Sequence, residues 1–493
     1  MLPSTLVRHR VLLSATFASL LCGLITGANA QTSSYNPFVE DAQNMRLVGY
    51  NDLQGRSAYQ PTIQHQGDRW IAYIGHHNGS AQNPLAGGEE SNGTSIVDVT
   101  DPENPRYIYH LPGTDGDGDG ESEAQMVRTC SGSDLPNGVN GSYYLLRAVG
   151  RYGHELWDVT TPEEPVFLSS MEEDTGLVDT HKNWWECDTG IAYLVSGVEG
   201  WATRRMTQVY DLSDPTNPRF IRNFGLPGQQ PGAPNHEEMS KHDLHGPIAI
   251  GNRIYFGYGT FLDGVIQIID REKLLRGNPA VEDPFEPTDE NLEYPVISTM
   301  FTGPRLGAHT AFPVLGIDVD EFDDNTEGGT RDMLLVIGES LRNECRENRQ
   351  MMYMVDITDE MRPWPVGNYQ VPEGSGDFCS RGGRFGTHSS NENMTPIYYK
   401  NIVFLAYFNG GVRAVDIRDP WSPKELGYYI PPITEATTER CVIVDGVEQC
   451  KTAIQTNNLE IDDRGYVYAV DRANTGLHIV ELTGSAREVA NFE

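Results

Sequence analysis

A histidine recurs near the start of four successive segments of this chain. The segments read DTHKNWWE, KHDLHGP, GAHTAF and GTHSSNE, and the histidines that match in place are His181, His245, His309 and His388. Imidazole nitrogens bind Fe(II), Cu and Zn, so four rings that converge on one point would form a site for such a metal. The alternative is that each histidine caps a strand by a hydrogen bond to nearby backbone. Four histidines at matching places favour the metal, with Fe(II) as the first expectation and Cu or Zn as alternatives.

The second segment offers two histidines, His242 and His245. His181 precedes the apolar run IAYLV, which begins at Ile191, and His245 precedes the run IYFGYG, which begins at Ile254, at almost the same spacing. His242 lies farther from that run, so His245 fits the register better.

A metal-bound imidazole uses its second ring nitrogen to bond an outer acceptor, which fixes the orientation of the ring. Three carboxylates follow the corresponding segments closely and are candidates for that role: Glu186, Glu392 and Glu460.

The elements that would position these residues come from a repeated phrase, which reads SIVDVTDPENP at Ser95–Pro105. It returns as ELWDVTTPEEP, QVYDLSDPTNP, QIIDREK, MVDITDEMRP and RAVDIRDPWSP, and a weaker copy, HIVELTG, closes the set. In the full copies an apolar, β-branched run ends at an Asp. In four of them a Pro-x-x-Pro turn follows, which proline favours because it fixes φ and has no N–H to donate. Short apolar runs lie before and after each phrase, which indicates four strands per unit.

Seven such units predict an all-β chain folded as a seven-bladed β-propeller of four-stranded blades. The last unit ends at HIVELTG without a fourth strand, and MRLVGYNDL at Met45–Leu53 resembles the fourth strands of the other units. We therefore expect the N-terminal strand to complete the last blade and leave no free edge. Because the first strand of each blade lines the central channel, the four histidines would point toward one axis.

The phrases SIVDV, MVDITD and RAVDIRDP resemble the LVIVD repeats of bacterial extracytoplasmic β-propeller proteins. The resemblance covers nearly all of the chain after its first forty residues and implies the fold, but it implies no single activity, because the family is defined by its scaffold repeat. One histidine per inner strand is also similar to the four-histidine iron centre of carotenoid-cleaving oxygenases, and exported methanethiol oxidases are a second comparison. That similarity implies a metal held by His181, His245, His309 and His388.

The first thirty residues have the pattern of a signal peptide. Arg8 and Arg10 precede an apolar run at Val11–Ile25, and Ala28-Asn29-Ala30 fits a cleavage site. We expect cleavage between Ala30 and Gln31, which leaves residues 31–493 as a single propeller in the periplasm or outside the cell. Cys22 raises the alternative of a lipoprotein anchor, although Leu20-Leu21 lacks the small residue expected there.

The net charge excludes some partners. It is −34 for the whole chain and −36 after the two signal-peptide arginines are removed (−34 − 2). A field of this sign repels nucleic acid and anionic membrane surfaces. No other apolar run approaches the length of a membrane span. A small-molecule substrate fits these limits, and no protein partner can be named.

Six of the seven cysteines lie after the signal peptide, and export permits disulfides. Cys441 and Cys450 flank a hairpin with an Asp-Gly turn, so we expect a bridge between them. Cys130 and Cys187 occupy similar places in adjacent units, which leaves Cys345 to pair with Cys379. Six cysteines permit fifteen pairings, and the other pairings stay open.

The stretch TDGDGDGESE alternates Asp115, Asp117 and Asp119 with glycine, as a calcium loop does. Met126 stands at the twelfth position, where an EF-hand has Glu, so the alternatives are calcium on a Gly/Asp loop and a solvated surface loop.

The leading functional hypothesis is an exported metal-dependent oxidase or oxygenase that acts on a small molecule. The alternative is a non-catalytic propeller that binds partners on one face. Hydrolysis by a zinc-bound hydroxide ranks last, because the all-histidine ligand set offers no general base beyond the nearby glutamates. The sequence has no G-x-S-x-G, H-E-x-x-H or P-loop motif, which leaves nucleophilic hydrolysis and nucleotide chemistry without support.

Overall fold

Antiparallel sheets of four consecutive strands make up most of the molecule. The computed structural model describes residues 36–113, 124–150, 153–171, 177–234, 242–260, 263–319 and 329–492. The expected signal peptide and the candidate calcium ligands Asp115, Asp117 and Asp119 lie outside these ranges. Among the described residues no helix is long and apolar enough to cross a membrane.

Four sheets contain only four main strands. The first has β3 (Ala58–Gln66), β4 (Arg69–His76), β7 (Thr94–Asp98) and β8 (Arg106–Leu111). The second has β9 (Val127–Ser131), β10 (Tyr143–Val149), β11 (Gly153–Asp158) and β12 (Val166–Met171). The third has β18 (Leu244–Ile250), β19 (Arg253–Tyr258), β20 (Val265–Asp270) and β21 (Val296–Phe301). The fourth has β22 (Thr310–Asp318), β23 (Thr330–Ile337), β24 (Met352–Asp356) and β25 (Trp364–Tyr369).

Two larger sheets complete the set. One has β14 (Asn183–Trp185), β15 (Ile191–Val198), β16 (Met206–Asp211) and β17 (Arg219–Phe224), with β13 (Leu177–Val178) also paired to β15. The other has nine strands: β1 (Asp41–Gln43), β26 (Phe385–Ser390), β27 (Ile402–Phe408), β28 (Val412–Asp416), β29 (Lys424–Ile430), β32 (Thr456–Ile461), β33 (Val467–Asp471), β34 (Leu477–Leu482) and β2 (Met45–Asn51). The single pair Phe408↔Thr456 joins a group of five strands (β26 to β29 with β1) to a group of four (β32 to β34 with β2).

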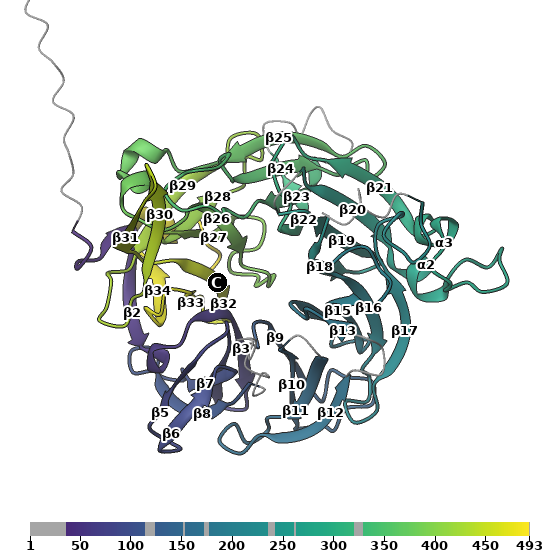
Figure 1. Ribbon diagram of the computed structural model, residues 1–493, viewed down its shortest axis with the longest axis horizontal. Coiled ribbons are helices and arrows are strands. Elements are labelled where there is room, and N and C mark those ends of the chain that lie inside the picture. The colour runs from purple at the N-terminus through teal and green to yellow at the C-terminus, as the bar shows by residue number, and fades with distance from the viewer. Residues whose placement is uncertain are drawn as a thin grey trace, which may run out of the picture. The chain divides into compact units, whose positions relative to one another are not determined.

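The strands of these groups confirm the all-β propeller architecture (Figure 1). The first strands contact one another in the closed order β3, β9, β14, β18, β22, β26, β32 and back to β3. Strand pairing does not separate the two groups that share the nine-stranded sheet, so the blade count of seven stays a prediction.

The repeated phrase forms the turn between the third and fourth strands. The Asp that ends each run accepts a hydrogen bond from the backbone N–H two residues later: Asp98 from Thr100 (3.0 Å) and Asp211 from Ser213 (2.9 Å). The next acidic residue repeats the contact, as Asp214 does with Thr216 at 3.0 Å. Such Asx turns satisfy the backbone locally where the chain leaves the sheet.

The N-terminal strand closes the ring, as the sequence predicted. β2 pairs antiparallel with β34 from Met45↔Leu482 to Asn51↔Leu477. Met45 is buried among Val480, Leu482 and other residues of this last sheet. The edge of β34 is therefore covered by a strand from the other end of the chain.

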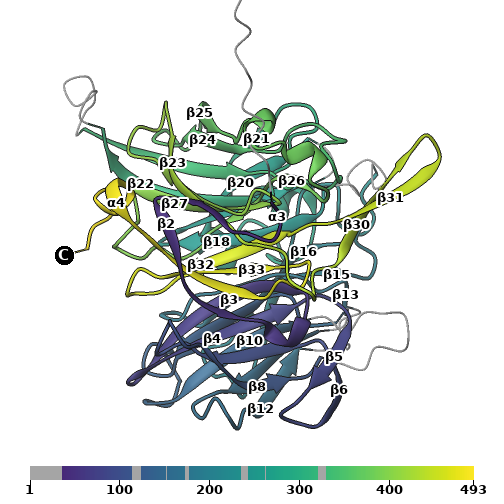
Figure 2. The same cartoon turned by 90° about the vertical axis from the view of Figure 1, so that its left-hand side faces the viewer.

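All three expected disulfides are present: Cys130–Cys187, Cys345–Cys379 and Cys441–Cys450. The last bridges a hairpin of β30 (Glu439–Val444) and β31 (Val447–Thr452), which is inserted between β29 and β32. A second hairpin, β5 (Ser80–Asn83) with β6 (Gly88–Ser91), is inserted between β4 and β7. Figure 2 shows both hairpins projecting on the same side. The short helices are α2 (Arg271–Arg276), α3 (Asp289–Glu293) and α4 (Gly484–Arg487).

Candidate metal centre

The four predicted histidines lie at corresponding places on neighbouring inner strands. His181 shortly precedes β14, His245 is the second residue of β18, His309 directly precedes β22, and His388 lies within β26. Adjacent first strands contact one another around the ring, so a side chain at this one place on each strand meets its neighbours near the centre.

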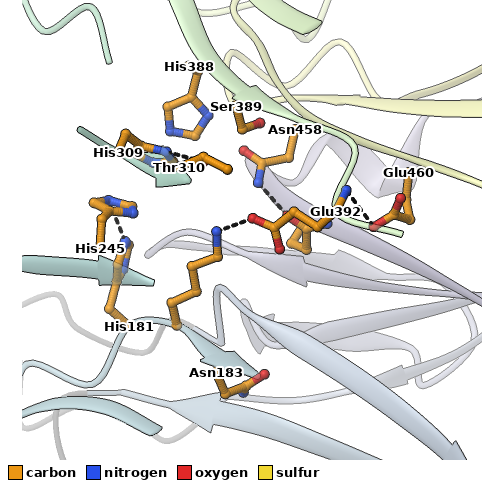
Figure 3. A network of polar contacts seen from close by, with 12 residues as sticks. His181, Asn183, His245, His309, Thr310, His388, Ser389, Glu392, Asn458 and Glu460 are labelled. Atoms are coloured by element: carbon orange, nitrogen blue, oxygen red, sulfur yellow. Dashed lines mark hydrogen bonds and ion pairs between the residues drawn. The ribbon is translucent and has the colours of Figure 1, made fainter. Parts of the chain in front are cut away.

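The structure brings the four imidazoles together (Figure 3). The ring centroids of His181 and His245 are 4.5 Å apart, those of His245 and His309 3.5 Å, and those of His309 and His388 4.5 Å. The Nε2 atoms of His181 and His245 are separated by 3.0 Å. Two nitrogens that share one ion at about 2.1 Å would lie about 3 Å apart when they occupy adjacent positions.

The hydrogen bonds of the rings leave nitrogens free to bind a ligand. His388 donates from Nδ1 to the backbone oxygen of Asn457 at 2.5 Å, which places its proton on Nδ1 and a lone pair on Nε2. His309 Nδ1 lies 2.9 Å from the hydroxyl of Thr310, while its Nε2 is buried without a hydrogen-bond partner. Buried polar atoms without partners are rare because they cost free energy. A metal ion bound between His309 Nε2 and His388 Nε2 would give both nitrogens a partner.

Burial keeps the four imidazoles neutral. It lowers the pKa of His181, His245, His309 and His388 well below the usual value, and the charges of Arg205, Lys182, Arg384 and Arg472 lower the pKa values further. Neutral imidazole is the form that ligates metals. The centre is therefore prepared for a cation before one binds.

A fifth ligand candidate, Glu339, was not predicted from the sequence. Ligand atoms of Glu339, His245 and His309 all lie within 4.8 Å of one another, and its Oε1 is 3.7 Å from His388 Nε2. Strand pairing explains its position: β22 and β23 are antiparallel with Thr310 opposite Ile337, so residues before β22 meet residues after β23. The register of this pairing comes from the structure, so no signal for Glu339 was available in the sequence alone.

Tyr59 is the second residue that sequence reasoning missed. It is the second residue of β3, which corresponds to the histidine positions, and its hydroxyl lies 3.2 Å from His181 Nε2. Burial raises its pKa well above the usual value, so the phenol keeps its proton. The alignment of the first strands marked this place in every unit, but a search limited to histidine passed over it.

The three predicted carboxylate partners do not bond the imidazoles. Glu186 pairs with Arg271 at 2.5 Å, because the guanidinium offers a charged fork on the outer side of the strand. Glu392 pairs with Lys182 and Arg128 instead. Glu460 accepts backbone N–H groups of residues 392 and 393 at 3.4 and 3.3 Å. The acceptors that do bond the rings are the Asn457 carbonyl and, by its proximity, the Thr310 hydroxyl.

Glu392 and Glu460 form a second layer to one side of the four imidazoles (Figure 3). Burial alone would raise the pKa of Glu392, but Lys182 and Arg128 hold it below its usual value. Burial raises the pKa of Glu460 to about 8. Gly246 makes room for the Lys182 stem, since an added Cβ would lie 2.4 Å from Lys182 Cδ.

A cavity of about 810 Å³ opens onto the histidine side of this layer. His181, His245, His388 and Glu339 line it, together with Tyr59, whereas His309 is fully buried. His242, the alternative to His245, borders a separate cavity with Leu226 and Phe301. The cavity has the size of small-molecule sites.

No protein-family model matches the chain, and no curated protein is significantly similar to it. Two solved structures are similar to the chain at low sequence identity. The β-propeller domain of Cps50 (Swd1) from Myceliophteria thermophila is 10% identical, with 90% of this chain and 100% of that chain covered and a TM-score of 0.46. Sqt1 from Chaetomium thermophilum is 9% identical, with the same coverage and a TM-score of 0.44. The fold assignment rests on the strand pairing described above.

Proposed function

We propose that this protein is a metal-dependent oxidoreductase that acts on a small molecule in the central cavity. One observation carries the proposal: four buried imidazoles with lowered pKa values, from four neighbouring inner strands, meet at the floor of a cavity of about 810 Å³. Isolated structural histidines have no reason to gather in this way, because neutral rings gain little from one another once they are buried.

Fe(II) is the metal we propose, with Cu or Zn as alternatives. The donor set is rich in imidazole, and the grouping of His245 and His309 with Glu339 has the composition of the two-histidine, one-carboxylate sites that hold non-haem Fe(II). When bound, such an ion supplies oxidation chemistry with O₂ as the oxidant. The protein holds the imidazoles neutral and orients His388 through Asn457.

We also propose that the protein is exported and is related to LVIVD-repeat propellers. Three disulfides support export, because such bridges persist in oxidising compartments. The repeated Asp-capped turns support the relationship, because they are the structural form of the repeated phrase.

Metal content tests the proposal most simply. The purified protein is incubated separately with Fe(II) without oxygen, Cu(II) and Zn(II), freed of excess metal and analysed for elements. We expect about one ion per chain in the parent, and a loss of at least tenfold in bound metal in His245→Ala and His309→Ala. The matched control is His65→Ala, whose half-exposed ring stacks on Trp70 away from the centre.

The same metal-loaded samples are then assayed for oxidation activity. We expect the Fe(II)-loaded parent to consume O₂ with at least one member of a set of small alcohols, thiols and hydroxy acids, and His309→Ala to lose that uptake. Retention of Zn alone would favour hydrolysis instead. A parent that binds none of the three metals would contradict the proposal. The alternative of a non-catalytic propeller that binds partners on one face would then remain.

A further inference from the structure

The cavity above the histidines is lined by cations, although the chain as a whole is strongly acidic. The formal net charge is −34, yet the described lining residues include a single carboxylate, Glu339. They also include five arginines: Arg204, Arg205, Arg384, Arg440 and Arg472. A concave, positively charged wall raises the local concentration of anions.

Two of the arginines are already neutralised. Arg204 pairs with Asp179 at 3.2 Å and with Asp243 at 2.9 Å, and Arg205 pairs with Asp179 at 3.2 Å. These contacts hold the segment after β15 against the segment before β18. The remaining three come from the nine-stranded sheet and its inserted hairpin.

Arg384 and Arg440 are only partly satisfied by the protein. Arg384 donates to Glu339 at 3.0 Å and to the backbone oxygen of Ser340 at 3.2 Å. Arg440, on β30, donates to the backbone oxygen of Arg472 at 3.1 Å, and no carboxylate among the described residues pairs with it. Both side chains therefore keep donors available to the cavity.

The Arg472 guanidinium has no hydrogen-bond or ion-pair partner within the described parts of the chain. The adjacent Asp471 cannot serve, because its oxygens accept the backbone N–H groups of Gln455 at 2.5 Å and Ala473 at 2.6 Å. Burial and, to a smaller extent, repulsion from Arg384 and Arg440 together lower the pKa of Arg472 to about 10. Arg472 is half-buried, and an unpaired cation in this position beside two others is costly unless an anion joins them.

We propose that Arg384, Arg440 and Arg472, here called the arginine cluster, bind the oxyanion headgroup of a polar organic anion. Guanidinium groups suit this role because their planar forks match carboxylate, sulfonate and phosphate oxygens in pairs. The contacts of the arginine cluster are enough to support a binding site for an anion. That this anion is the substrate rests on the proposed function.

The cavity also indicates the rest of the ligand. Its volume of about 810 Å³ exceeds what an inorganic oxyanion fills, and its lining is mostly polar. Thr438 and Asn474 present a hydroxyl and an amide near the cluster, and the Thr438 hydroxyl is buried without a partner. A hydroxylated organic acid fits this wall, with its headgroup on the cluster and its remainder over the histidine floor.

Calorimetry with three probes separates the ligand classes. The full-length protein, both as purified and after treatment with a chelator, is titrated with gluconate, glucose and sulfate. We expect gluconate to bind both samples and glucose, which has similar size and no charge, to bind neither. Sulfate tests the headgroup alone, and we expect it to bind at least tenfold more weakly than gluconate and to compete with it.

Variants place the binding on the cluster. Arg472→Gln and Arg440→Gln each remove one charge and are expected to weaken gluconate binding at least tenfold, whereas Arg472→Lys should recover part of the loss. The matched control is Arg418→Gln, a half-exposed arginine on an outer turn that pairs with Asp416, which should bind gluconate as the parent does. Two independent positions keep the test valid if one variant fails to fold.

The outcomes distinguish this inference from the proposed function. Gluconate and sulfate that both fail to bind, or binding that Arg472→Gln and Arg440→Gln leave intact, would overturn the anion site. Sulfate binding as tight as gluconate binding would overturn the organic ligand. Gluconate binding by a protein that takes up none of Fe(II), Cu(II) and Zn(II) would overturn the proposed function and leave the anion site standing.

Discussion

At the scale of single residues, burial and charge prepare the centre for a cation. The imidazoles of His181, His245, His309 and His388 are buried with lowered pKa values, so protons do not compete with a metal in the ordinary pH range. Tyr59 stays protonated beside them, and Glu339 is the carboxylate that lies close to the rings among the residues that the structure describes. The electrostatic role of each group follows from its surroundings more than from its residue type.

Replacing Glu339 tests whether its carboxylate takes part in binding the metal. In Glu339→Gln the carboxylate charge near His245, His309 and His388 is removed while its size is kept. We expect Fe(II) to bind about 10- to 100-fold more weakly, as for other groups that support metal ligands. A titration monitored by a competing chelator measures the change. Glu360→Gln, which breaks an outer pair with Arg253, serves as the control; equal affinities in parent and Glu339→Gln would exclude Glu339 from the centre.

Glu460 should make stability depend on pH. Burial raises its pKa to about 8 from a usual value near 4.5, so the folded state holds the proton that the unfolded chain releases. This contribution to stability is present below about pH 4.5 and is lost as the pH rises to about 8. Glu460→Gln should therefore gain stability relative to the parent across this window, on the order of 4 kcal/mol at pH 8.

Urea unfolding at pH 5, 6, 7 and 8 measures that difference. The exposed change Glu103→Gln controls for the substitution itself. A difference between Glu460→Gln and the parent that stays constant with pH would show that Glu460 does not hold its proton in the folded state.

At the scale of elements, one place on the inner strand decides what faces the centre. Histidine occupies it near β14, β18, β22 and β26, and Tyr59 occupies it on β3. The repeat made the four histidines predictable, because each lies in the first segment of its unit. The spacing to the next strand is similar for His181 and His245, which precede β15 and β19, and longer for His309 and His388. Tyr59 was missed because the search followed a residue type and not a position.

Other parts of the site could not be predicted from spacing alone. Glu339 follows a second strand and reaches the centre only through the pairing of Thr310 with Ile337. Arg440 lies on an inserted hairpin, whose direction no repeat specifies. Glu186 was assigned to the wrong partner, because its distance along the strand did not reveal that Arg271 faces it from the outer side.

The disulfides should differ in what they stabilise. Cys130 and Cys187 are 57 residues apart and link neighbouring units, whereas Cys441 and Cys450 are 9 residues apart within one hairpin. Loop-closure entropy gives about 4 kcal/mol for the first and about 3 kcal/mol for the second. We expect the double change to Ala at Cys130 and Cys187 to lower the free energy of unfolding more.

The hairpin disulfide should instead affect binding. Arg440 lies on β30 beside Cys441, so replacing Cys441 and Cys450 by Ala should weaken gluconate binding by loosening that arginine. Urea unfolding and calorimetry on the two double variants measure both effects. A larger loss of stability from the hairpin pair than from Cys130 and Cys187 would contradict this ranking.

At the scale of the whole molecule, closure makes the centre part of the fold. β2 seals the last sheet against β34, and the inner strands contact one another in a closed order. The ligands come from four segments that are far apart in sequence, so an ion that joins them stabilises the folded ring over the unfolded chain.

Metal binding should therefore raise stability by mass action. At a free Fe(II) concentration of 100 times Kd, the free energy of unfolding should rise by about 2.7 kcal/mol. Anaerobic urea unfolding with and without Fe(II) measures the rise, and His245→Ala should show none of it. A parent whose stability is unchanged by Fe(II) at concentrations that load the protein would mean that the ion sits outside the folded centre.

The most direct measurement is an X-ray anomalous difference map from crystals of the protein loaded with Fe(II), with data collected above and below the iron edge. The account predicts one dominant peak about 2–2.5 Å from the Nε2 atoms of the imidazoles that meet at the cavity floor. Loaded crystals with no peak among His181, His245, His309 and His388, or with the iron bound elsewhere on the molecule, would contradict it.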